Sequence, residues 1–164
     1  MSELTKAIGE RFPGAVQEIV EFRGETTVVV GPGKAKAILR FLKEERGFNY
    51  LVDVSSAHWP DEGRIDVVWL VRNLKTREQL RVRSPLPEEA PEVETVADLW
   101  RTANWLEREV YDLMGVVFTG HPDLRRILMP EDFEGHPLRK EYPMEGDDEW
   151  RNYLPVEEGP HDHR

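Results

Sequence analysis

Residues 107–143 hold most of the side chains in this chain that could do chemistry. One short phrase occurs there twice, as Gly120-His121-Pro122-Asp123-Leu124-Arg125-Arg126 and as Gly135-His136-Pro137-Leu138-Arg139-Lys140. Each copy combines a flexible glycine, a titratable histidine, a rigid proline, an apolar leucine and a basic pair. The combination predicts two fixed backbone corners that bury their leucines and display their cations.

Two histidines among acidic side chains raise the possibility of metal chemistry. His121, Asp123 and His136 are of the residue types that bind zinc. Their spacing matches no metal-binding motif, and the proline after each histidine prevents one regular helix from carrying both imidazoles. A stand-alone metal-dependent hydrolase using these three residues is an alternative of a different class. The simpler interpretation is that each histidine hydrogen-bonds nearby backbone and holds its turn.

Other catalytic patterns are weaker. Gly31-Pro32-Gly33-Lys34 lacks the glycine spacing and the following Ser or Thr of a phosphate-binding loop, and it is more typical of the start of a helix. Ser55-Ser56 near His58 does not form a nucleophile elbow, and alternate residues of a strand face opposite ways. We therefore expect no catalytic, cofactor-binding or metal-binding residue on this chain.

The charged positions 107–112 suggest contact with another protein. Arg108 and Asp112 are four residues apart, so they can pair on one face of a helix. That face could be exposed to solvent or could bind another protein, and the sequence is compatible with both interpretations. Arginine is enriched at protein interfaces. The basic pairs Arg125-Arg126 and Arg139-Lys140 also suit partner carboxylates better than nucleic acid.

The elements that must position these residues follow from periodicity. Helices are expected over 2–12 and from Gly31 to Gly47, and strands over 16–22, 26–30, 49–59, 64–74 and 77–83. The predicted fold is α+β, with an antiparallel or mixed sheet, helices packed on one face, and then a helix and an extended, turn-rich C-terminal segment.

The same pattern divides the chain into four stretches within one structural domain. They are an α+β sheet region over 1–84, a Pro/Glu-rich connector over 85–94, a helix with the repeated phrases over 95–143, and an acidic extended tail over 144–164. The helix is expected to start at Thr95 and to end near Met114. Trp105 lies partly off its apolar stripe, which indicates a second contact face or a break near Thr102.

Composition limits the class of function. The 164 residues carry a net charge of −10, which disfavours nucleic acid or an anionic membrane as the main partner. The chain contains no cysteine, which excludes disulfides, a cysteine nucleophile and thiolate-bound iron–sulfur clusters. We expect neither a secretory signal nor a membrane-spanning helix, so any membrane contact would come through a partner.

A family resemblance rests on several of these motifs. The matching pieces are Glu107-Arg108-Glu109, Asp112, Gly115, Phe118, the two Gly-His-Pro phrases with Ile127-Leu128, and Tyr142-Pro143. Together they resemble the 30-kilodalton subunit family of respiratory complex I, the NADH–quinone oxidoreductase. The likeness is most specific over about residues 95–143, whereas the first half of the chain agrees in element order more than in motif.

The resemblance implies a peripheral-arm subunit without a redox centre of its own. It would bind the large quinone-site subunit and the iron–sulfur subunits, with FMN and the iron–sulfur clusters on partners, and quinone and NADH reached only through the complex. The resemblance implies that the chain lies at the cytoplasmic face of the cell inner membrane as a peripheral subunit. The expected subunit-interface residues are Glu107, Arg108, Asp112, His121, Asp123, Arg125, Arg126, His136, Arg139 and Lys140.

Alternatives remain at this stage. The first is the equivalent subunit of a related membrane-bound hydrogenase, or of a quinone oxidoreductase driven by ferredoxin or a reduced deazaflavin. The second is a generic binding module unrelated to respiration.

Overall fold

A computed structural model describes residues 3–143 of the protein. The expected acidic tail, 144–164, lies outside the described residues. The elements, in chain order, are α1 (Glu3–Arg11), β1 (Val16–Phe22), β2 (Glu25–Val30), α2 (Pro32–Arg46), β3 (Tyr50–Trp59), a 3₁₀ turn (Pro60–Glu62), β4 (Arg64–Arg72), β5 (Gln79–Pro87), β6 (Glu92–Glu94), α3 (Ala103–Met114) and β7 (Val117–Thr119).

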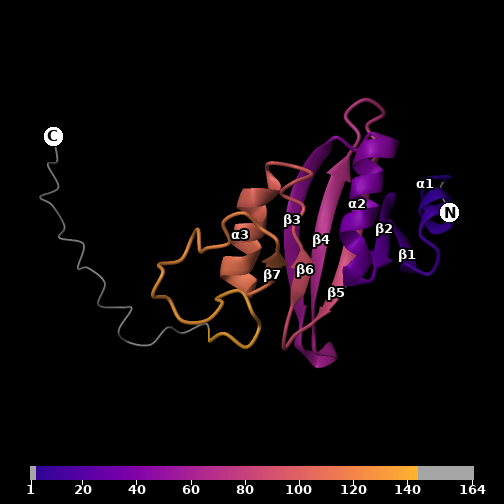
Figure 1. Ribbon diagram of the computed structural model, residues 1–164. Coiled ribbons are helices and arrows are strands. Elements are labelled where there is room, and N and C mark those ends of the chain that lie inside the picture. The colour runs from indigo at the N-terminus through magenta and orange to yellow at the C-terminus, as the bar shows by residue number, and fades with distance from the viewer. Residues whose placement is uncertain (1–2, 144–164) are drawn as a thin grey trace, which may run out of the picture.

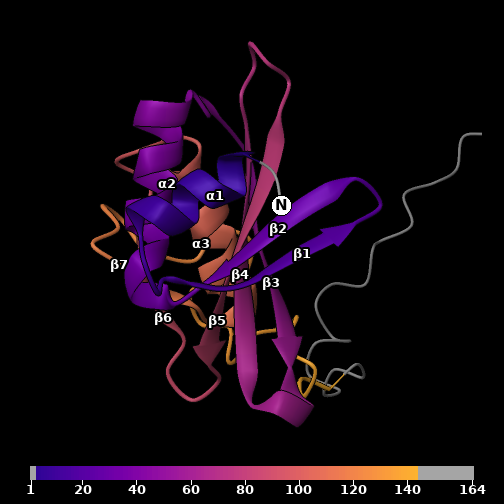
Figure 2. The same ribbon diagram turned by 90° about the vertical axis from the view of Figure 1, so that its right-hand side faces the viewer.

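The main sheet is mixed and has five strands in the order β1-β2-β5-β4-β3. Hairpins join β1 to β2, β3 to β4 and β4 to β5, and the parallel contact between β2 and β5 brings the first hairpin against the other three strands. All three helices lie on one side of this sheet (Figures 1 and 2). The predicted α+β class, with helices on one face, is confirmed.

Alternation along the strands explains why only one face is covered. In β4, Ile65, Val67, Trp69 and Val71 are fully buried, while Arg72 at the end of the other face is exposed. The buried row of β4, with that of β5, forms one core cluster with the apolar stripe of α2. Burying this row holds the sheet and helix layers together.

Helix α2 begins and ends as its sequence predicts. Pro32 occupies the first turn after Gly31, which supports the helix-start interpretation of Gly31–Lys34. Gly47 ends the helix in the left-handed region, at φ 74°, and its N–H donates to the Leu42 carbonyl. On the outer side, Lys36 lies 3.1 Å from the Asp98 carboxylate, which ties α2 to the loop that precedes α3.

The predicted connector 85–94 is partly strand. β5 continues to Pro87, and Glu92–Glu94 forms β6, which pairs in parallel with β7. Pro85 and Pro87 are tolerated because β2 contacts β5 only at residues 81–83. Beyond Arg83, that side of β5 is an edge that needs no N–H donors.

The predicted start of the third helix at Thr95 is wrong. The Thr95 hydroxyl accepts the Ala97 N–H at 3.1 Å and donates to the Glu107 carboxylate, which closes residues 95–97 into a turn. Residues 97–102 form turns, and α3 begins at Ala103, directly after Thr102. The break indicated by Trp105 is therefore present.

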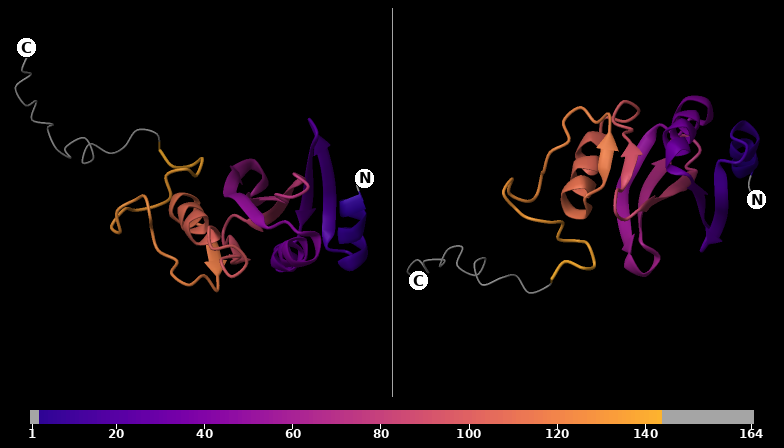
Figure 3. Two further views of the ribbon diagram at one scale, coloured as in Figure 1. Left: turned by 90° about the horizontal axis from the view of Figure 1, so that it is seen from above. Right: turned by 60° about the horizontal axis from the view of Figure 1, so that its bottom comes forward.

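After β7, residues 120–143 form turns and bends with no helix or strand, which confirms the extended, turn-rich segment. Seen from above, α3 and this segment lie at one end of the molecule and α1 and β1 at the other (Figure 3). Within residues 3–143, no helix is long and apolar enough to cross a membrane.

Candidate functional site

The carboxylate of Asp112, on the last turn of α3, is completely buried and receives four close hydrogen bonds. Its Oδ2 accepts backbone N–H groups from Ile127 (3.0 Å), Leu128 (2.7 Å) and Met129 (2.9 Å). Its Oδ1 accepts the Arg126 guanidinium at 2.7 Å. Asp112 therefore fixes the direction of the chain over four successive residues.

Arg126 extends this arrangement to the second Gly-His-Pro corner. Its Nη2 also donates to the carbonyls of Phe133 (2.8 Å) and Gly135 (3.0 Å). The guanidinium lies over the Phe133 ring, which stacks on Tyr142. A planar group with five donors suits this task, because it reaches a carboxylate and two carbonyls at once.

His136 and Arg139 bind the carboxyl end of α3. His136 Nδ1 lies 2.9 Å from the Asp112 carbonyl, and Arg139 Nε donates to the Met114 carbonyl at 2.8 Å. The Leu138 N–H donates to the Leu113 carbonyl at 3.1 Å. These contacts satisfy carbonyls that the helix leaves unpaired, and a cation there also suits the helix dipole. We call Asp112, Arg126, His136 and Arg139 the Asp112 clamp.

The surroundings keep Asp112 charged. Burial alone raises the pKa of this carboxyl, but the three backbone N–H donors and Arg126 outweigh burial and lower its pKa. The clamp is therefore an ion pair set in a shell of backbone donors at neutral pH.

Glu107, on the inner side of α3, forms a second buried acidic site. Its side chain is wholly buried, and it accepts hydrogen bonds from the Thr95 hydroxyl (2.5 Å) and the Val96 N–H (2.8 Å). Burial raises the pKa of Glu107 to about 7, against the opposing effect of these hydrogen bonds. Glu107 thus ties α3 to the turn before it and titrates near neutral pH.

His121 holds the first Gly-His-Pro corner. Its Nδ1 accepts the Asp123 N–H at 3.0 Å, and its Nε2 lies 3.1 Å from the Asn104 carbonyl, so the neutral ring carries its proton on Nε2. Burial lowers the pKa of His121 against the raising effect of the Asn104 carbonyl. The interpretation that this histidine holds its turn is confirmed, and His136 does the same toward α3.

Arg108 does not pair with Asp112 among the described contacts. It donates instead to the carbonyls of Arg125 (3.1 Å) and Arg126 (2.9 Å), and its guanidinium lies over the exposed Trp105 ring. Arg108 is only 7% exposed, so its guanidinium binds these internal carbonyls rather than solvent or a partner.

The expected interface residues therefore fall into two groups. Exposed members are Asp123, Arg125 and Lys140, whereas Glu107, Arg108, Asp112, His121, Arg126, His136 and Arg139 contact the protein's own backbone or side chains. The expectation that both corners display cations and bury leucines is wrong in part. One cation of each pair turns inward, and Leu138 is 59% exposed, while Leu124 packs against the core.

The structure reveals a further group that sequence reasoning missed. The side chain of His58 on β3 is fully buried, and its Nδ1 accepts the Lys140 N–H at 3.0 Å and lies 3.1 Å from Glu141. Its Nε2 lies 2.9 Å from Glu88 but is poorly aligned for a hydrogen bond. No spacing links positions 58, 88 and 141, so no sequence signal could have found the group.

His58, Glu88 and Glu141 have the donor types of a cation site, and no other such group is found within residues 3–143. The Lys140 N–H, however, occupies the Nδ1 lone pair, so the neutral ring bears its proton on Nε2, where a metal would need a lone pair. These contacts are better explained as attaching residues 140–141 to β3 than as a metal site. His121, Asp123 and His136 are not brought together as the hydrolase alternative requires.

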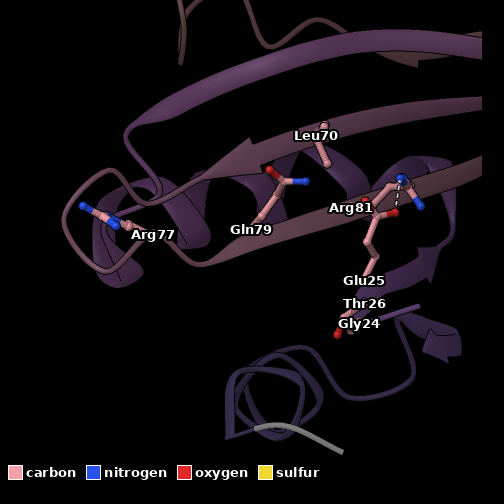
Figure 4. Close-up of a pocket in the computed structure, with 7 residues that line it drawn as sticks. All are labelled: Gly24, Glu25, Thr26, Leu70, Arg77, Gln79 and Arg81. Atoms are coloured by element: carbon pink, nitrogen blue, oxygen red, sulfur yellow. Dashed lines mark hydrogen bonds and ion pairs between the residues drawn. The ribbon is translucent and has the colours of Figure 1, made fainter. Parts of the chain in front are cut away.

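The uncovered face of the sheet carries a separate polar hollow, lined by Gly24, Glu25, Thr26, Leu70, Arg77, Gln79 and Arg81 (Figure 4). Arg81 pairs with Glu25 at 2.7 Å across β2 and β5. The one carboxylate of the lining, Glu25, is held by this ion pair, and the lining includes no histidine or second carboxylate that would define a reaction. The hollow is best explained as part of the charged sheet surface.

The chain matches a family of known proteins along most of its length. The family model described as "Respiratory-chain NADH dehydrogenase, 30 Kd subunit" matches residues 28–148. The corresponding NADH-quinone oxidoreductase subunit of Geotalea uraniireducens is 44% identical over 90% of this chain and 93% of the relative. That of Geobacter sulfurreducens is 44% identical over 90% and 94%. The chain belongs to the 30-kilodalton subunit family of respiratory-chain NADH dehydrogenase.

Two solved structures share the fold. A chain from "the membrane-bound sulfane sulfur reductase (MBS), an archaeal respiratory membrane complex" superposes with a TM-score of 0.78 at 26% identity, over 93% of this chain and 91% of that one. A trypsin-resistant fragment of Nqo5 superposes with a TM-score of 0.62 at 36% identity, over 74% and 96%.

Replacing Gly115 tests the packing of the Asp112 clamp. Gly115 ends α3 at φ 75°, and an added Cβ would lie 2.6 Å from the His136 ring and 2.9 Å from Arg139 Nη2. Gly115→Ala should lower the free energy of unfolding by about 2–4 kcal/mol, through left-handed strain and displacement of both side chains. Gly14→Ala is the matched control, because Gly14 has φ 74° and open space around it, and should cost only about 1–2 kcal/mol. Equal losses in denaturant titrations would show that the clamp is not tightly packed.

A pH series tests Glu107. Between the unfolded value of 4.5 and the folded pKa of about 7, the folded state keeps a proton that the unfolded state releases. Glu107 therefore makes the free energy of unfolding fall as pH rises through this window. The free energy of unfolding of Glu107→Gln, taken relative to that of the wild-type protein at the same pH, should rise by on the order of 2–3 kcal/mol from the low-pH end of that window to its high-pH end. The exposed neighbour Glu109→Gln should show no such gain, and a flat difference for Glu107→Gln would refute the raised pKa.

Proposed function

We propose that this chain is a cofactor-free structural subunit of the peripheral arm of an NADH–quinone oxidoreductase. It binds the large quinone-site subunit and the iron–sulfur subunits. The iron–sulfur clusters and FMN are held by partner subunits of the complex. The observation that carries this proposal is membership of the 30-kilodalton subunit family, over 90% of the chain for the relatives compared. The chain supports electron transfer from NADH to quinone, coupled to proton translocation, by holding its neighbours in place.

The contacts of the Asp112 clamp support a structural role rather than a catalytic one. Asp112, Arg126 and His136 order the segment 120–143, which forms neither helix nor strand. An ordered segment presents a fixed surface, and a preorganised surface loses less entropy when a partner binds. Such rigidity is useful in this setting because electron transfer slows steeply as the distance between redox centres grows.

The surface next to the clamp has the side chains that protein interfaces favour. Trp105 and Leu128 are each 61% exposed, and the Arg125 side chain, whose Nε pairs with Asp123 at 2.9 Å, is 65% exposed. Tryptophan and arginine are over-represented among the residues that dominate binding energy. Since Arg126 and Arg139 turn inward, the contact with partner carboxylates falls to Arg125 and Lys140.

Membrane association comes through these partners, at the cytoplasmic face of the cell inner membrane. The chain's net charge of −10 gives no general attraction to anionic lipid. Nucleic acid is disfavoured as a partner for the same reason.

A second candidate is the equivalent subunit of a related respiratory membrane complex. The superposition on a chain of the archaeal sulfane sulfur reductase complex favours this candidate, because it shows the same fold in another such assembly. Membrane-bound hydrogenases and ferredoxin- or deazaflavin-driven quinone oxidoreductases are of the same kind. The co-purified subunits separate the candidates, since an NADH-binding flavoprotein belongs to the first alone.

Affinity purification from the native membrane tests the proposal. Tagged wild-type chain should recover the quinone-site, iron–sulfur and NADH-binding flavoprotein subunits, identified by mass spectrometry. Arg125→Glu should reduce that recovery by about tenfold, which corresponds to ~1.4 kcal/mol of binding, while the isolated chain keeps its unfolding midpoint. Arg72→Glu, exposed at the end of β4, is the control and should leave recovery unchanged. Recovery of no oxidoreductase subunit by the wild-type chain would contradict the function, and full recovery by Arg125→Glu would remove Arg125 from the interface.

A further inference from the structure

A groove runs along strand β3, between the sheet and the C-terminal part of the molecule. Two adjoining cavities of about 160 and 500 Å³ share Ser56, Met114 and Leu138 in their linings. One is lined by residues 53–56 and the other by residues 56–59, so together they follow β3 over seven consecutive positions. At about 3.3 Å per residue, this length is close to 20 Å. We call it the β3 groove.

The strand beside this groove is an edge strand. In the described part of the chain, β3 has a hydrogen-bonded neighbour on one side only, β4. Alternate residues of such a strand direct their backbone N–H and C=O groups away from the sheet. An extended peptide can pair with such groups as an added strand.

The opposite wall of the groove is apolar. It is formed by Val110, Leu113 and Met114 of α3 together with Leu138. Leu138 is 59% exposed and Trp59, at the far end, is 44% exposed. These side chains would be covered by apolar residues at every second position of an added strand.

The two ends of the groove differ in charge. Asp53 and Glu109 line the end at residue 53. Lys140 lines the end at residue 59, where Glu88 and Glu141 lie 2.9 and 3.1 Å from the His58 ring, so that end carries both signs of charge. Glu109 and Lys140 are exposed, so their charges are available to a partner. The occupant that complements this surface is an extended segment with a cation toward Asp53 and Glu109.

We propose that the β3 groove receives an extended segment of a neighbouring subunit, which adds to the sheet as a strand along β3. The segment is about seven residues long, apolar at alternate positions, and basic at the end that faces Asp53 and Glu109. This inference rests on the proposed function, because it takes the occupant from the same complex.

Site-specific photocrosslinking within the assembled complex tests the proposal. The exposed Ser55 on β3 is replaced by a benzophenone amino acid, Ser55→p-benzoylphenylalanine, and the crosslinked peptide is identified by mass spectrometry. The proposal expects a crosslink to one extended segment of another subunit. Leu74→p-benzoylphenylalanine, in the β4–β5 connection and outside the groove lining, is the control for non-specific crosslinking and should not capture that segment.

A pair of matched substitutions measures the energetic role of the groove. Leu138→Glu places a charge in the apolar wall and should weaken association with the complex by tenfold or more. The Leu138 backbone bond to Leu113 does not depend on the side chain, so the variant should keep its fold and its unfolding midpoint. Leu74→Glu, at 56% exposure, should leave association unchanged.

The outcomes separate this inference from the proposed function. If the chain assembles but Ser55 captures no segment of another subunit and Leu138→Glu binds normally, the groove proposal fails and the function stands. If no complex is recovered, both fail. A crosslink from Ser55 to residues 144–164 of the same chain, or to a second copy, overturns the proposal by naming a different occupant.

Discussion

The segment 120–143 of this protein depends on one buried charge, the Asp112 carboxylate. Three successive backbone N–H groups and the Arg126 guanidinium replace the water that this carboxylate loses on folding. Removing one partner of a buried ion pair typically costs about 3–5 kcal/mol, because the other charge stays buried and uncompensated. The chain direction at 126–129 and the placement of the second corner at 133–136 both follow from satisfying this charge.

Two different forces therefore hold the two parts of the molecule. Burial of the apolar rows of β4 and β5 under α2 stabilises the sheet layer. The segment 120–143 forms turns without helix or strand, and hydrogen bonds between charged side chains and its backbone order it. His58 and Glu107 extend these bonds to β3 and to the turn at 95–96. A scaffold built this way gives its neighbours a fixed surface, which is what the proposed role in an electron-transfer complex requires.

Local patterns predicted the elements whose ends have local causes. The strand at Val16–Phe22 and the helix between Gly31 and Gly47 have turn or capping residues at both ends. The start of α3 was missed because Glu107, twelve positions away, holds Thr95 in a turn. The two Gly-His-Pro phrases were recognised as a unit from the sequence. The sequence did not show which of their side chains point inward, because only the folded chain shows that Arg126 and Arg139 donate to backbone carbonyls of α3 and its neighbours. The His58, Glu88 and Glu141 group had no sequence signal at all.

The Asp112 charge orders the segment 120–143, while the sheet layer stands without it. Amide hydrogen exchange of the full-length Asp112→Asn variant tests this claim most directly. Protection of residues 126–139 should fall at least tenfold, whereas the amides of α2 and β4 should exchange as in the wild-type protein. Unchanged protection over 126–139, or an equal loss of protection throughout the sheet, would contradict the account.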